Sequence, residues 1–157
     1  MRLLTAFSLI GGLALGASFA TAGGHSDPLA AAVKARQAHM TLYSFNLGPL
    51  GGMARGNIDY DAEAAQRAAD NLAALTSVSQ AGYWPPGSDS EAVEGSRALP
   101  AIWADGSDIG AKGAEFVDAV TMLQAEAGKG LEALQAAMGP VGKGCGGCHE
   151  AYRVPND

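Results

Sequence analysis

Residues 131–149 read LEALQAAMGPVGKGCGGCH, and this stretch decides the fold. Its apolar and sulfur-bearing side chains recur every three or four residues, which is the spacing of one face of an α-helix. They are Leu131, Leu134, Met138, Val141, Cys145 and Cys148. The spacing therefore predicts a helix whose cysteines face the protein core. Pro140 removes one main-chain hydrogen bond, so a break into two helices at Gly139-Pro140 is the alternative.

Three earlier stretches show the same helical spacing. The first starts at Ser26-Asp27-Pro28, where short oxygen-bearing side chains accept backbone N–H groups and proline fits the first turn. The second spans about 59–82, and the third spans about 107–128. Their inward-facing residues are predicted to be Val33, Met40, Tyr43, Leu47 and Leu50, then Ala65, Ala68, Leu72 and Leu75, then Phe116, Val120 and Leu123.

Between the second and third stretches, residues 82–107 contain Pro85-Pro86-Gly87, Gly95, Pro100 and Gly106. Such a composition cannot hold a long helix and predicts an extended connection. No alternating pattern typical of a strand is found from residue 23 onward. We therefore predict an all-α protein, an antiparallel four-helix bundle with a long loop between helices two and three and a site in its core.

The first 22 residues have the pattern of an export signal. Arg2 precedes an apolar run that reaches Phe19, and Ala20-Thr21-Ala22 fits the small-residue cleavage rule. The alternative is a membrane anchor, but this apolar run is short for a bilayer span and contains glycines, which argues against it. We expect a signal peptide at 1–22 and a domain at 23–157 in the bacterial periplasm, without membrane insertion after cleavage. A net charge of −6 argues against nucleic-acid partners.

Both cysteines of the chain lie in the motif Cys145-Gly146-Gly147-Cys148-His149. This pattern is typical of covalent haem attachment, because each thiol bonds to one haem vinyl group while the adjacent imidazole reaches the iron. On a helix the three side chains project from about one turn in a common direction. A redox dithiol and a zinc site that recruits His25 or His39 are the alternatives. We expect one haem c, bound through two thioethers.

Four segments together resemble the class II cytochromes c, the cytochrome c′ family. They are 145–153, with the ending C-x-x-C-H-x-x-aromatic-basic; 36–40, an Arg-Gln-x-x-Met segment; Tyr60-Asp61; and 100–103, a P-x-I-W segment. The resemblance implies that Cys145 and Cys148 are the thioether anchors and that His149 is the proximal iron ligand. It also implies that Arg36 and Gln37 contact the haem propionates. The helical spacing places Arg36 toward the core, where a guanidinium needs an anionic partner.

Met40 separates two branches of that family. In one branch a methionine of the first helix ligates the iron, and in the other an apolar side chain only covers a five-coordinate iron that binds small gases. Segments 46–56 and 138–143 resemble the first, low-spin branch more closely, so Met40 is expected to be the second iron ligand. Met53 is a weaker candidate, and Met40 as simple core filler is the alternative.

These expectations give a function. We expect an electron carrier, not an enzyme, that passes single electrons between periplasmic redox proteins acting as donor and acceptor. The alternative is a five-coordinate protein that binds nitric oxide or other small gases. A homodimer through the first two helices is a further expectation, packed through Ala62, Ala65 and Ala69. His39, Glu150 and Arg153 are expected on the surface, and Trp84 and Trp103 in the core or as loop anchors.

Overall fold

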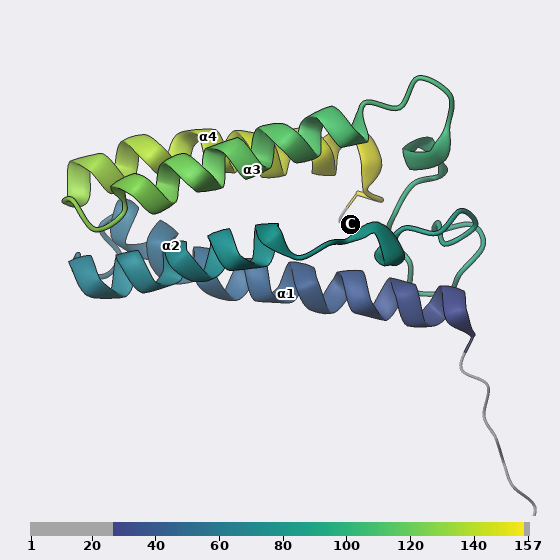
Figure 1. Ribbon diagram of the computed structural model, residues 1–157, viewed down its shortest axis with the longest axis horizontal. Coiled ribbons are helices and arrows are strands. Elements are labelled where there is room, and N and C mark those ends of the chain that lie inside the picture. The colour runs from purple at the N-terminus through teal and green to yellow at the C-terminus, as the bar shows by residue number, and fades with distance from the viewer. Residues whose placement is uncertain (1–26, 156–157) are drawn as a thin grey trace, which may run out of the picture.

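Four long helices make up most of residues 27–155, the part of the chain that the computed structural model describes (Figure 1). They are α1 (Pro28–Ala54), α2 (Ala62–Ser77), α3 (Ile109–Glu126) and α4 (Leu131–Tyr152). Two short 3-10 turns, η1 (Ala81–Tyr83) and η2 (Pro100–Trp103), lie in the connection from α2 to α3. Residues 27–155 form no β-strand, only an isolated bridge between Ala98 and Arg153. The all-α prediction is confirmed.

Consecutive helices run in opposite directions, with α1 beside α2 and α3 beside α4 (Figure 1). The antiparallel four-helix bundle and its long loop between helices two and three are therefore confirmed. No helix within 27–155 has the length and apolar character needed to cross a membrane. The predicted signal peptide, residues 1–22, lies outside the described residues.

Aspartate side chains cap the N-termini of α1 and α2. The Asp27 carboxylate accepts a hydrogen bond of 2.9 Å from the backbone N–H of Leu29, and Asp61 accepts one of 2.9 Å from Ala64. Each cap satisfies a backbone donor that has no partner within the helix. At the start of α4, Gly130 has a φ of 134°, a conformation that favours glycine and turns the chain back from α3.

Helix α4 continues through Pro140 without the break that the sequence left open. Proline at this position frees the carbonyl of Ala136, one turn earlier. Both Pro140 and Ala136 are exposed, so water can take the lost hydrogen bond. The predicted cysteine motif therefore lies on the same rigid helix as the core residues Leu134 and Val141.

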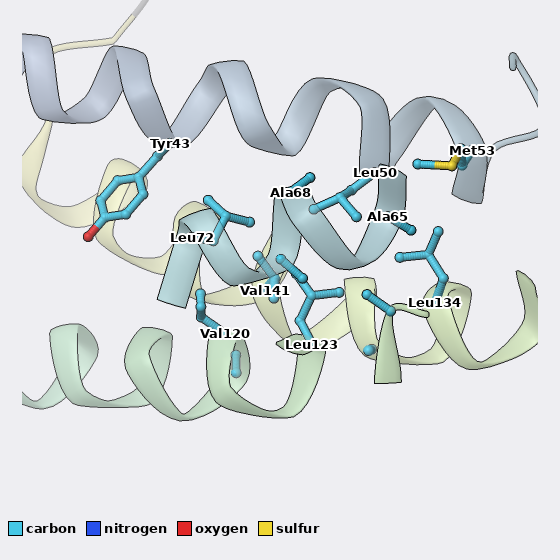
Figure 2. Close-up of a cluster of buried hydrophobic side chains, with 14 residues drawn as sticks. Tyr43, Leu50, Met53, Ala65, Ala68, Leu72, Val120, Leu123, Leu134 and Val141 are labelled. Carbon is cyan, nitrogen blue, oxygen red and sulfur yellow. The ribbon is translucent and has the colours of Figure 1, made fainter. Parts of the chain in front are cut away.

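The apolar core extends from the α1–α2 and α3–α4 connections at one end of the bundle to Tyr43 (Figure 2). Each helix contributes fully buried side chains to it: Leu50 and Met53 from α1, Ala65 and Leu72 from α2, Val120 and Leu123 from α3, and Leu134 and Val141 from α4. Most were predicted from the helical spacing. Leu131 was predicted inward but is 38% exposed, because it opens α4 just outside the bundle.

Two alanines predicted to form a dimer surface lie in this core instead. Ala65 and Ala69 are 0% exposed, since α2 packs them against the other helices of the bundle. Small residues on an amphipathic helix allow close helix packing, and here the packing is within the chain. That part of the dimer prediction is wrong.

Candidate haem pocket

The opposite end of the bundle, beside the long loop, contains a cavity of about 1060 Å³. All six residues predicted for the site line it: Arg36, Gln37 and Met40 from α1, and Cys145, Cys148 and His149 from α4. Residues 36 and 149 are far apart in the sequence, and the antiparallel arrangement of α1 and α4 brings them to the same space. Helix α3 adds Phe116 and Val117 to the wall.

The cysteine motif presents its three reactive side chains from one turn of α4. Both thiols are free and half-buried. Burial raises the pKa of each, and the nearby ammonium of Lys112 opposes this for Cys148, so both stay protonated thiols at neutral pH. Burial and then the positive charges of Arg153 and Arg97 lower the pKa of His149. A neutral imidazole keeps a lone pair for a metal ion.

These residues fit a haem. The cavity is large enough for a flat organic cofactor, it is mainly apolar, and two free thiols and one neutral imidazole line it. The buried Nε atom of Arg153, one turn beyond His149, has no hydrogen-bond partner among the described residues. Buried polar atoms are normally paired, so this atom indicates a missing partner in the cavity wall. Arg153 was expected in solvent, and that expectation is wrong because the residue is half-buried and lines the cavity.

Arg36 is buried, as predicted, but its partners in the structure are neutral loop oxygens. Its guanidinium donates to Ser88 Oγ at 2.8 Å, to the Ser88 carbonyl, to Ser96 Oγ at 2.6 Å and to the Tyr83 carbonyl at 3.3 Å. It also lies 4.9 Å from the centre of the Trp84 ring. Burial lowers its pKa, and Asp89 opposes that shift. Arg36 thus ties α1 to the long loop, and its contact with a propionate stays a prediction.

Further contacts hold the loop over the cavity. Gln37 donates to the Gly95 carbonyl at 2.8 Å, and the indole of Trp103 donates to the Trp84 carbonyl at 3.1 Å. Trp84 also contacts Arg36 of α1, so of the two predicted alternatives for the tryptophans, core or loop anchor, the second is confirmed for Trp84. Arg97 donates to the carbonyls of Val154 and Pro155 at 2.7 and 2.9 Å, which ties the loop to the end of α4.

The two candidate methionines have different surroundings. Met40 lines the cavity and is 39% exposed. Met53 is 2% exposed in the apolar core, and its sulfur accepts a hydrogen bond of 3.3 Å from the Asp61 N–H. Met53 is therefore removed from the candidate ligands, whereas iron ligation by Met40 stays a prediction.

His39 was expected on the surface but is only 5% exposed. One residue from the core-facing stripe, it points to the side of α1 that the loop covers. Its ring packs edge-on against Tyr43, with ring centres 4.7 Å apart, and lies 5.8 Å from Tyr83. The helical spacing could not show this, because residues 80–83 supply the cover. Sequence reasoning also gave Tyr43 and Gln80 no part in the site, although a buried tyrosine hydroxyl requires a polar partner.

Several known proteins that are similar to this chain are cytochromes. Cytochrome c-554 of Cereibacter sphaeroides is 46% identical over 121 residues, covering 77% of this chain and 91% of that protein. Cytochrome c′ of the same species is 40% identical over 122 residues, covering 78% of this chain and 82% of that protein. The solved structure of cytochrome c′ from Rhodobacter sphaeroides has a TM-score of 0.80 and 38% identity, covering 83% of this chain and all of that one.

Other solved relatives hold gases. A cytochrome c′ variant from Alcaligenes xylosoxidans with bound nitric oxide has a TM-score of 0.69 and 32% identity, covering 82% of this chain and 97% of that one. A carbon-monoxide-bound variant of the same protein has a TM-score of 0.70 and 33% identity. These relatives contradict the electron-carrier interpretation and favour the gas-binding alternative. The expected likeness to the low-spin, six-coordinate branch is not supported either.

The family model described as cytochrome c′ matches residues 31–153. This range includes all four helices except the first turn of α1, and it includes the whole candidate pocket. The resemblance drawn from four short segments is therefore borne out over most of the chain, and the chain belongs to the cytochrome c′ family.

Proposed function

We propose that this protein binds one haem c and uses it to bind nitric oxide, carbon monoxide or a similar small gas. The observation that carries this proposal is the cavity at the loop end of the bundle, which Cys145, Cys148 and His149 of α4 and Met40 of α1 all line. The gas complexes of similar proteins support it. We propose reversible binding without turnover, so the protein is not an enzyme.

Each wall of the cavity has its own task. Cys145 and Cys148 would anchor the haem by thioether bonds, and His149 would hold the iron from the α4 side. When bound, the haem supplies an iron centre with one coordination position for a gas. Met40, on the α1 side, would cover that position without closing it. Phe116 and Val117 keep the space apolar, which favours a small neutral ligand over water.

The predicted location and assembly belong to the same proposal. Export by the segment 1–22 would place the protein in the periplasm, where haem is attached to c-type cytochromes. A homodimer would use the outer face of α1, where Leu42 and Phe45 are 49% and 76% exposed. Exposed apolar side chains one turn apart are typical of an interface. Phe45→Lys should then shift a sedimenting dimer to monomer, and an unchanged sedimentation coefficient would remove this surface.

Visible spectra of the purified holoprotein test the function. We expect a five-coordinate, high-spin spectrum in the ferrous state and a new spectrum on adding carbon monoxide. Met40→Ala should speed carbon monoxide binding, because a covering side chain is removed, and should leave the coordination number unchanged. A six-coordinate wild-type spectrum that becomes five-coordinate in Met40→Ala would overturn the proposal and make Met40 the second iron ligand.

A further inference from the structure

Tyr43 is a buried side chain with a polar hydroxyl in the cavity wall, and the proposed function gives it no role. It is 6% exposed and projects from α1 one turn beyond Met40. Its ring packs edge-on against Phe116, with centres 5.3 Å apart, and against His39. Figure 2 shows its hydroxyl pointing away from the labelled apolar side chains. The ring therefore belongs to the core, whereas the hydroxyl belongs to the cavity.

The hydrogen bonds of this hydroxyl leave its proton unused. The side-chain amide nitrogen of Gln80 donates to the Tyr43 oxygen at 3.1 Å. The same nitrogen lies 3.4 Å from Nε2 of His39, which accepts its second proton in the tautomer that carries the ring proton on Nδ1. The Tyr43 oxygen is thus an acceptor. No acceptor for its own proton is found among residues 27–155, and the hydroxyl lies at the cavity, where a ligand could supply one.

The hydroxyl is also a lasting donor. Burial raises the pKa of Tyr43, although the hydrogen bond from Gln80 opposes this shift. The group therefore keeps its proton throughout the physiological pH range. A buried donor without an acceptor is unfavourable, which favours any ligand that supplies one.

We propose that the Tyr43 hydroxyl donates a hydrogen bond to the gas bound in the cavity, and that Gln80 and His39 position it. The proposal rests on the gas-binding function. Its ligand class is a diatomic molecule whose outer atom can accept a hydrogen bond, as the oxygen of nitric oxide or carbon monoxide can. Arg36 and Gln37, two turns earlier on α1, already donate hydrogen bonds to the loop, so Tyr43 is the donor on α1 that is free to bond the gas.

The C–O stretching frequency of the carbon monoxide complex is the test. A donor to the oxygen lowers this frequency, so Tyr43→Phe should raise it. The variant keeps the ring and its packing. Its carbon monoxide should dissociate about two- to tenfold faster, the size of one neutral hydrogen bond. Tyr83→Phe is the matched control, because Tyr83 also contacts His39 but does not line the cavity. It should leave frequency and rate unchanged.

A second variant examines the direction of the bond. In Gln80→Leu the hydroxyl loses its positioning partner, so the frequency should move part of the way toward that of Tyr43→Phe. If the Tyr43 proton instead went to the Gln80 carbonyl oxygen, Tyr43→Phe would leave the frequency unchanged and Gln80→Leu would lower it. Either result would overturn the proposal. Absence of any carbon monoxide complex in the wild type would instead overturn the gas-binding function itself.

Discussion

At one end of the bundle, Leu123 and Leu134 are fully buried among apolar side chains, whereas at the other end the polar residues Arg36 and His39 are buried against the long loop. The apolar end is closed by Tyr60, whose hydroxyl donates to the Ala127 carbonyl at 2.8 Å and accepts from the Gly130 N–H at 2.9 Å. These bonds join the α1–α2 turn to the α3–α4 turn. Stability at that end comes from the close packing of apolar side chains from all four helices.

The loop end is held together in a different way. There the helices line a cavity of about 1060 Å³, which packed side chains do not fill. Instead the loop of 78–108 crosses the opening, and Arg36 is bonded to three of its residues. One bundle thus combines an end built for stability with an end built for a ligand. Changes at the two ends should therefore separate stability from binding.

The largest expected effect is at the loop end, from Cys145→Ala/Cys148→Ala. Without thiols there is no thioether, so the variant should carry no covalent haem. Mass spectrometry should find one haem on the wild type and none on the variant, and acid-acetone should extract haem only from the variant. The apolar end should still fold, as followed by helical circular dichroism. A haem that stays covalently bound to the variant would refute the assignment of both anchors.

At the apolar end, Leu123→Ala should lower the free energy of unfolding by about 2–5 kcal/mol, because it leaves a cavity in a packed core. Urea denaturation measures this. Met122→Ala is the matched control, since Met122 is next in sequence but 54% exposed, and it should change stability little. Carbon monoxide affinity should be the same in all three proteins. A large loss of affinity in Leu123→Ala would show that the two ends are coupled.

A smaller effect is expected from Arg36→Leu. The variant loses the charged hydrogen bonds to Ser88 and Ser96 and should be less stable by about 1–3 kcal/mol. The loop should become the first site of limited proteolysis, because its main tie to α1 is gone. Lys34→Leu removes an exposed cation from the same helix and serves as the control. Equal proteolysis of Arg36→Leu and wild type would show that the loop does not depend on Arg36.

Much of the site was predictable because its residues share one helical stripe or one motif. The three- and four-residue spacing placed Leu134, Val141 and both cysteines on one face of α4. The partners of Arg36 were not predictable in the same way. A guanidinium facing the core suggested an anion, yet the loop supplies hydroxyl and carbonyl oxygens. Loops of this composition carry no periodic pattern from which a contact could be derived.

The sequence by itself determined the helices, their order and the haem-attachment motif, because helical spacing, end caps and a Cys-x-x-Cys-His run are local properties of the chain. Only the tertiary structure decided which buried polar groups meet. Gln80 and His39 are 41 residues apart, and Arg36 and Ser96 are 60 apart. Such pairs form when the loop folds back over α1, and the position of the loop depends on the packing of the whole bundle. The hydrogen bond from Gln80 to the Tyr43 hydroxyl likewise depends on the position of the loop.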